Sequence, residues 1–191
     1  MSTRTSFWLA FLVLLIAAGL RLWSLSQLPD GLHPQEITSL RVSDAIRGGQ
    51  IGVFYPIDGG REVLFYAGLA LMTSAVGSGT IIHHIIPVWI SLLTLALVYT
   101  LGVRLYGRVA GLAAMGTMAL MLPSLLFSRT LVVESTLPLL VTACMLALAR
   151  ALQVYRREQS ETSTTTAFAT LGALLGISFY LHPISLLLNL G

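Results

Sequence analysis

The stretch Thr80–Val103, TIIHHIIPVWISLLTLALVYTLGV, decides the fold class, because it contains no arginine, lysine, aspartate or glutamate. A helix that crosses the hydrocarbon core of a bilayer needs about 20 mostly apolar residues, and this stretch exceeds that length. The rest of the 191-residue chain has the same character, with 55% hydrophobic and 10% charged residues, whereas soluble domains have about 25% charged residues. This composition excludes an ordinary soluble enzyme and a nucleic-acid-binding arm, and it predicts a multi-span membrane protein.

Five stretches are apolar enough to predict membrane spans: Phe7–Leu25, Thr80–Val103, Val109–Phe127, Leu131–Leu152 and Ala167–Leu190. The first also has the length of a signal-peptide core, but no small-residue cleavage site follows it. Its Arg21 and Trp23 are typical of side chains that anchor a helix at the membrane interface. We therefore expect an uncleaved anchor, and an all-α fold in which about five spans form a transmembrane helical bundle.

A sixth apolar stretch, Val63–Val76, is too short to cross comfortably, and the arginines indicate where it lies. If it does not cross and the N-terminus is cytoplasmic, six of the eleven basic residues fall inside: Arg4, Arg104, Arg108, Arg150, Arg156 and Arg157. Six of the eight acids then fall outside: Asp30, Glu36, Asp44, Asp58, Glu62 and Glu134. If it crosses, only Arg4 and Arg129 stay inside. The positive-inside rule favours the first arrangement, so we predict that Val63–Val76 is a helix along the outer interface.

This topology makes residues 26–79 one long outer loop with juxtamembrane helices, within a single transmembrane region that covers residues 1–191. Pro34 and Glu36 are suited to a first helical turn, and Gly48-Gly49 to a helix end, so a helix is expected over Pro34–Arg47. Asp44 is expected to pair with Arg41 or Arg47. Tyr155–Thr166 is predicted as a cytoplasmic linker. Because the last span ends at Gly191 without a polar tail, the chain is expected to be part of a longer protein or a truncated gene product.

Arg129 and Glu134 lie at the predicted outer ends of the third and fourth spans. Two interpretations stay open: an ion pair that ties the turn, or a polar cavity that both residues share with the outer loop. His83 and His84 begin the second span, but no further ligand cluster accompanies them in the sequence, so we expect no metal site. The lone cysteine, Cys144, leaves no intrachain disulfide.

The outer loop opens with Leu28-Pro29-Asp30-Gly31-Leu32-His33-Pro34-Gln35-Glu36, and Arg61-Glu62 leads into the short apolar helix. Val103-Arg104-Leu105-Tyr106-Gly107-Arg108 and Phe127-Ser128-Arg129 follow later. In this order the motifs resemble the N-terminal part of GT-C membrane glycosyltransferases, in particular bacterial relatives of protein O-mannosyltransferases and of the lipid A aminoarabinose transferase. The resemblance extends from about Arg21 to Tyr180.

The resemblance implies a bacterial plasma-membrane enzyme that transfers sugar from a polyprenyl-phosphate donor to an acceptor on the outer face. It implies that the catalytic positions are Gln35 and Glu36, and that the substrate contacts come from His33, Tyr55, Arg61, Glu62, Arg129 and Glu134. It implies no metal and no other cofactor. The expected partners are the lipid-linked sugar, the bilayer and other membrane subunits, with no nucleic acid.

The sequence departs from this family at the position of the first acid, which is Gln35. An amide does not accept a proton at ordinary pH, and losing a positioned base costs about 10²–10⁴ in rate. Two functions therefore stay open, an active glycosyltransferase and a non-catalytic membrane subunit that keeps the same scaffold. A transporter is a third and weaker candidate, because it would place ionisable residues near the middle of the bilayer.

Overall fold

The computed structural model describes residues 2–23, 34–50, 52, 54–55, 61–77, 80–152 and 161–181. His33 lies outside these residues, as do the side chains of Arg61 and Glu62. The described elements are almost entirely helical: α1 (Thr3–Leu22), α2 (Pro34–Arg47), α3 (Val63–Val76), α4 (Thr80–Tyr106), α5 (Arg108–Leu120), α6 (Leu122–Phe127), the 3₁₀ turn η1 (Val133–Thr136), α7 (Leu137–Ala151) and α8 (Glu161–Leu181). A small antiparallel hairpin pairs β1 (Phe54–Tyr55) with β2 (Arg61–Glu62).

Three helical segments of the described chain are long and apolar enough to cross a membrane: Thr3–Leu22, His83–Tyr106 and Val133–Ala151. Shorter apolar helices cover Arg108–Leu120 and Thr165–Phe179, where the sequence predicted two further spans. The fold is therefore that of an all-helical membrane protein. The predicted linker Tyr155–Thr166 is wrong in its second half, because α8 already begins at Glu161.

The predicted third span is not one helix, because Met121 has an extended backbone that separates α5 from α6. Pro123 follows in the first turn of α6, where its missing N–H is tolerated. In a continuous helix that N–H would have bonded to the carbonyl oxygen of Ala119. The proline thus leaves the last turn of α5 with a carbonyl group that needs another donor.

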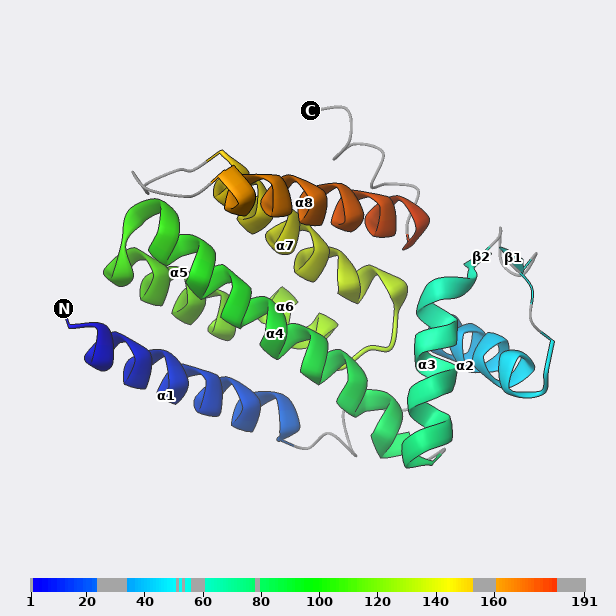
Figure 1. Ribbon diagram of the computed structural model, residues 1–191. Coiled ribbons are helices and arrows are strands. Elements are labelled where there is room, and N and C mark those ends of the chain that lie inside the picture. Colours follow the sequence, from blue (N-terminus) through cyan, green and yellow to red (C-terminus); the bar gives the residue numbers. More distant parts are fainter. Residues whose placement is uncertain are drawn as a thin grey trace.

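The long helices lie side by side, as Figure 1 shows, with α1, α5 and α8 running in one direction and α4 and α7 in the other. Neighbours in the bundle include α4 with α5, α4 with α7, and α7 with α8. The α4–α5 contact depends on two glycines. A Cβ atom on Gly102 would lie 2.7 Å from the Cα of Gly111, and one on Gly111 would lie 2.6 Å from the Val103 Cγ2. Only the absence of side chains lets the two backbones approach this closely.

The two ends of the bundle carry different groups. At one end, the Arg108 Nη2 donates to the Thr3 hydroxyl at 2.7 Å, and the Arg104 Nε donates to the Ala149 carbonyl at 3.2 Å. The N-terminus, the α4–α5 turn and the end of α7 therefore meet there. At the other end lie α2, α3 and the hairpin (Figure 1).

The helix α2 has the bounds that the sequence predicted, Pro34–Arg47. It ends because Gly49 adopts a positive φ of 87°, which allows the Gly49 and Gln50 N–H groups to bond back to the last turn. Asp44 forms the expected ion pair with Arg47 at 3.5 Å. Local sequence signals are sufficient for this element.

The helix α3 also has its predicted bounds, Val63–Val76, and Figure 1 shows it lying across the end of the long helices. Tyr66, Leu69, Ala70 and Thr73 are buried, and their spacing puts them on one helical face. Leu71 and Met72 are exposed. One face of α3 thus packs on protein while apolar side chains remain outside. This is the arrangement expected of an interfacial helix, although its position in a membrane remains a prediction.

A small second core joins the elements at this end. Val42 of α2, Tyr55 of the hairpin, Tyr66 of α3 and Val133 of η1 are all buried and pack together. The loop 26–79 therefore includes a packed structure that is attached to the helical bundle through η1. The hairpin was not predicted, because the sequence from Phe54 to Glu62 has no alternating strand pattern.

Candidate functional site

The side chain of Glu36 lies at the junction between α2 and the bundle. It is fully buried, and its Oε1 accepts a hydrogen bond from the backbone N–H of Leu131 at 2.7 Å. Leu131 belongs to the turn between α6 and η1, which also carries Arg129, and Glu134 follows in η1. Glu36 therefore connects the predicted catalytic helix to the turn that the sequence associated with it.

The same turn is bonded to two further helices. The buried His84 of α4 donates from Nδ1 to the Arg129 carbonyl oxygen at 2.9 Å. The Arg129 Nη2 donates to the carbonyl oxygens of Leu20 and Trp23, at 2.9 and 3.0 Å, where α1 ends. We call Glu36, His84 and Arg129 the turn-clamp residues, because together they attach α1, α2 and α4 to the 128–131 turn.

Glu134 belongs to η1, which follows the 128–131 turn. It lines a cavity of about 430 Å³ together with Phe127, Leu137, Pro138, Val141 and Thr142. The buried residues Leu131, Val132 and Val133 fill the intervening turn. That Glu36, Arg61, Arg129 and Glu134 line one shared cavity stays a prediction, because the side chain of Arg61 lies outside the described residues.

The remaining predicted site residues have different environments. Gln35 is exposed in the first turn of α2, next to the buried Glu36. Tyr55 is buried, and its hydroxyl donates to the Gln50 carbonyl and accepts from the Gly52 N–H, so it closes the turn before the hairpin. Arg61 and Glu62 form strand β2, but their side chains lie outside the described residues, and so does all of His33.

Arg21 is the functional candidate that sequence reasoning missed. The sequence predicted an anchor at the membrane interface, but the structure buries the side chain completely. The Arg21 Nε donates to the Ser91 hydroxyl at 2.9 Å, and its Nη2 donates to the Ser124 hydroxyl at 3.0 Å. Its Nη1 donates to the carbonyl oxygens of Ala17 and Ala119, both at 3.3 Å.

The burial of Arg21 has a physical reason. Because Pro123 has no N–H, the Ala119 carbonyl oxygen has no helical hydrogen-bond donor. Arg21 supplies a donor in its place. The Ala119 carbonyl lies in the last turn of α5, at the negative end of the helix dipole. A signal was present in the sequence: Ser6, Ala10, Ala17 and Arg21 fall on one helical stripe, and the three small residues mark the face of α1 that packs against protein.

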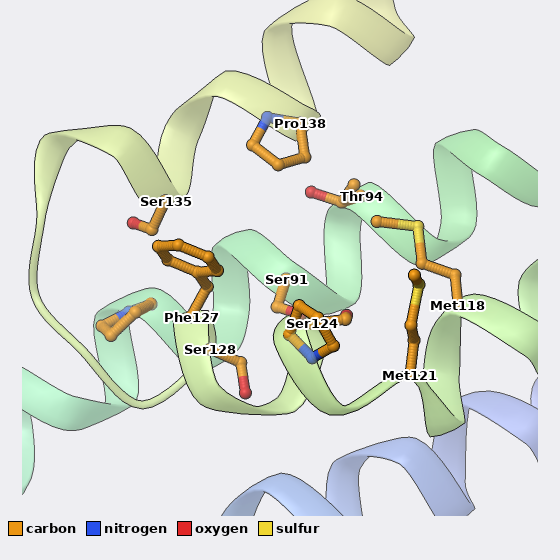
Figure 2. Close-up of a pocket in the computed structure, with 11 residues that line it drawn as sticks. Ser91, Thr94, Met118, Met121, Ser124, Phe127, Ser128, Ser135 and Pro138 are labelled. Atoms are coloured by element: carbon orange, nitrogen blue, oxygen red, sulfur yellow. The ribbon is translucent and has the colours of Figure 1, made fainter.

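The two serines that hold Arg21 line a cavity of about 220 Å³ between α4, α5, α6, η1 and α7 (Figure 2). Figure 2 shows Ser91 of α4 and Ser124 of α6 next to each other in the lining, with Met121 and Phe127 on the α6 side. Met121 and Phe127 are both more than half exposed. The exposed lining of the cavity is almost entirely apolar, and its polar atoms, including the two serine hydroxyls, contribute very little of it.

No group of three or more metal-ligating side chains occurs among the residues that the structure describes. Comparison with protein-family models, with curated proteins and with solved structures finds no match. The functional assignment therefore depends on the motifs of the sequence and on the geometry of the turn clamp and the cavities.

Proposed function

We propose that this chain is a glycosyltransferase-like membrane protein of the GT-C type, which binds a polyprenyl-phosphate-linked sugar at the outer face of a bacterial plasma membrane. The observation that carries the proposal is the position of Glu36. Its carboxyl group is held against the Leu131 backbone by a 2.7 Å hydrogen bond, at the end of the apolar helices where α2, α3 and the 128–131 turn meet. A lipid-linked sugar lies at this depth, because its polyprenyl chain stays in the bilayer.

The proposed topology has five spans and a cytoplasmic N-terminus. The alternating directions of α1, α4, α5, α7 and α8 support it (Figure 1), with α5 and α6 together forming a broken third span. Arg104 and Arg108 lie with Thr3 and Ala149 at the end of the bundle opposite α2. The positive-inside rule makes that end cytoplasmic.

The chemistry of sugar transfer sets two requirements. A group must take the proton of the acceptor, and a cation must stabilise the charge on the departing phosphate. Gln35 is exposed but cannot take the proton. Glu36 could take it, but its carboxyl group is fully buried and already accepts the Leu131 N–H. This observation favours the second candidate function, a non-catalytic subunit that keeps the scaffold and the substrate site.

Sugar transfer by the full chain in lipid vesicles distinguishes the two candidates. The assay uses a labelled polyprenyl-phosphate sugar with the wild type, Gln35→Asp and Glu36→Gln, and thermal unfolding checks that each variant is folded. Asp44→Asn is the control, because Asp44 is an exposed acid on the same helix that pairs with Arg47.

A non-catalytic scaffold predicts no transfer by the wild type and transfer by Gln35→Asp. An enzyme with Glu36 as its base predicts transfer by the wild type and by Asp44→Asn, and a loss of about 10²–10⁴ in Glu36→Gln. Transfer that survives Glu36→Gln would show that the site is placed wrongly. No transfer and no substrate binding by any variant would refute the proposed function.

A further inference from the structure

The cavity lined by Ser91 and Ser124 contains two hydroxyl groups of an unusual kind. A guanidinium group only donates hydrogen bonds, so both serine oxygens are acceptors of the Arg21 N–H groups. Each hydroxyl therefore keeps its own hydrogen for another partner. Within the described residues, no acceptor for either hydrogen is found.

The other hydroxyls of the cavity differ in this respect. Those of Thr94, Ser128 and Ser135 donate to the carbonyl oxygens of Ile90, Leu125 and Val132, at 2.8, 2.7 and 2.7 Å. This is the usual way in which a helix satisfies a buried hydroxyl. Ser91 and Ser124 thus supply the two donors that this cavity offers to a ligand, and the contact with a cation makes both hydroxyls stronger donors.

The Arg21 guanidinium, which contacts both serine hydroxyls, is positively charged and has no carboxylate partner in the described part of the chain. Arg21 bonds to two hydroxyls and two carbonyl groups, none of which carries a negative charge. Its Nε and Nη2 form the edge of the guanidinium that commonly grips a carboxylate or a phosphate. A buried cation at membrane depth is costly and usually marks a functional site. An anion in the cavity would reduce this cost.

The residues that line this cavity indicate that the anion belongs to a lipid. Met121, between α5 and α6, and Phe127, at the end of α6, are apolar and exposed on the helical bundle, so the cavity would open toward the bilayer. Its volume of about 220 Å³ is too small for a whole lipid. The neighbouring cavity of about 430 Å³ shares Phe127 and Pro138, and its lining is mostly apolar but includes Glu134 and Thr142; it provides a path for the first part of a chain.

We propose that Ser91, Ser124 and Arg21 form a binding site for the phosphate monoester of a membrane lipid. The two serine hydroxyls donate to the phosphate oxygens, Arg21 supplies the positive charge from behind, and the lipid chain leaves past Met121 and Phe127. The site does not depend on sugar transfer. It accepts the phosphate of a glycerolipid and the phosphate of a polyprenyl carrier by the same chemistry.

The test measures the melting temperature of the full chain in detergent with four added probes: dioleoylphosphatidic acid, undecaprenyl phosphate, dioleoylglycerol and inorganic phosphate. At about 100 times its Kd, a phosphate lipid should raise the melting temperature by about 5–10 °C. Dioleoylglycerol lacks the phosphate and inorganic phosphate lacks the chain, so neither should do so. Ser91→Ala and Ser124→Ala should each weaken binding by about tenfold. Ser128→Ala is the matched control and should change it by less than about twofold.

Stabilisation by both phosphate lipids identifies a general phosphate-lipid site, and stabilisation by one alone identifies the source. The proposal is overturned if dioleoylglycerol or inorganic phosphate stabilises as well as the phosphate lipids, if no lipid stabilises, or if Ser91→Ala and Ser124→Ala behave like Ser128→Ala. The lipid site and the proposed glycosyltransferase-like function can fail independently of each other. Serine-dependent binding of phosphatidic acid, without any sugar transfer, would support the lipid site and count against a glycosyltransferase.

Discussion

Replacement of Glu36 by alanine should destabilise the protein more than any change at its exposed neighbour Gln35. The substitution removes the acceptor of the buried Leu131 N–H, and an unsatisfied buried donor costs about 1–3 kcal/mol. It also removes one buried methylene group, which contributes about 0.8 kcal/mol. The expected loss is therefore about 2–4 kcal/mol. Glu36→Gln keeps a side-chain oxygen at the same position and should cost about 1 kcal/mol, because a neutral acceptor bonds more weakly.

Thermal unfolding of the purified protein in detergent measures this effect. For a chain of this length, 1 kcal/mol changes the melting temperature by about 2–4 °C, so Glu36→Ala should lower it by about 4–16 °C. Gln35→Ala is the control and should lie within about 2 °C of the wild type, since its cost at the surface is at most about 0.5 kcal/mol. Hydrogen exchange gives a local reading, because the Leu131 amide should exchange faster in Glu36→Ala. If Glu36→Ala has the same melting temperature as Gln35→Ala and the Leu131 amide exchanges no faster than in the wild type, Glu36 does not hold the turn.

Two further predictions concern the bundle. Gly111→Ala should destabilise the protein by about 1–3 kcal/mol, because the new Cβ atom would lie 2.6 Å from the Val103 Cγ2 and 2.8 Å from the Tyr99 carbonyl oxygen. Gly116→Ala, on the same helix, should instead stabilise the protein by about 0.5–1 kcal/mol, because a Cβ atom there would have no neighbour within 4 Å. Equal melting temperatures of the two variants would refute the close α4–α5 contact. In a Cys144→Ala background, a membrane-impermeant thiol reagent added outside cells should label Gln50→Cys and leave Tyr106→Cys unlabelled. Both positions are exposed, and the proposed topology puts them on opposite sides of the membrane. Labelling of both from outside would contradict that topology.

The sequence predicted best the elements whose limits depend on local chemistry. The helix α2 begins at a proline and ends at a glycine pair, and α3 is an apolar run bounded by turn residues, so both have the predicted bounds. The break at Met121 is different, because Pro123 can interrupt a span or only bend it. Whether the freed Ala119 carbonyl finds another donor depends on α1, which is distant in the sequence.

The site was predicted only in part, because it depends on side chains that are distant from one another in the sequence. The association of Glu36 with the turn around Arg129 follows from the topology, and the structure brings them together through Leu131. The directions of the Arg129 and Glu134 side chains depend on how Leu131, Val132 and Val133 pack, which no sequence pattern specifies. Arg21 was interpreted as an anchor because it lies near the end of a span. Its burial depends on the serines that α4 and α6 place beside it.

We propose that this chain binds a polyprenyl-phosphate-linked sugar at the end of the bundle that carries the turn clamp. Equilibrium binding tests it most directly, with a radiolabelled polyprenyl-phosphate sugar titrated into the full chain in nanodiscs of phosphatidylcholine and with empty nanodiscs as the reference. We expect saturable binding that an excess of unlabelled donor displaces and that the free polyprenyl alcohol, which lacks the phosphate, does not displace. Partition equal to that of the empty nanodiscs, or displacement by the alcohol as efficient as by the donor, would contradict it.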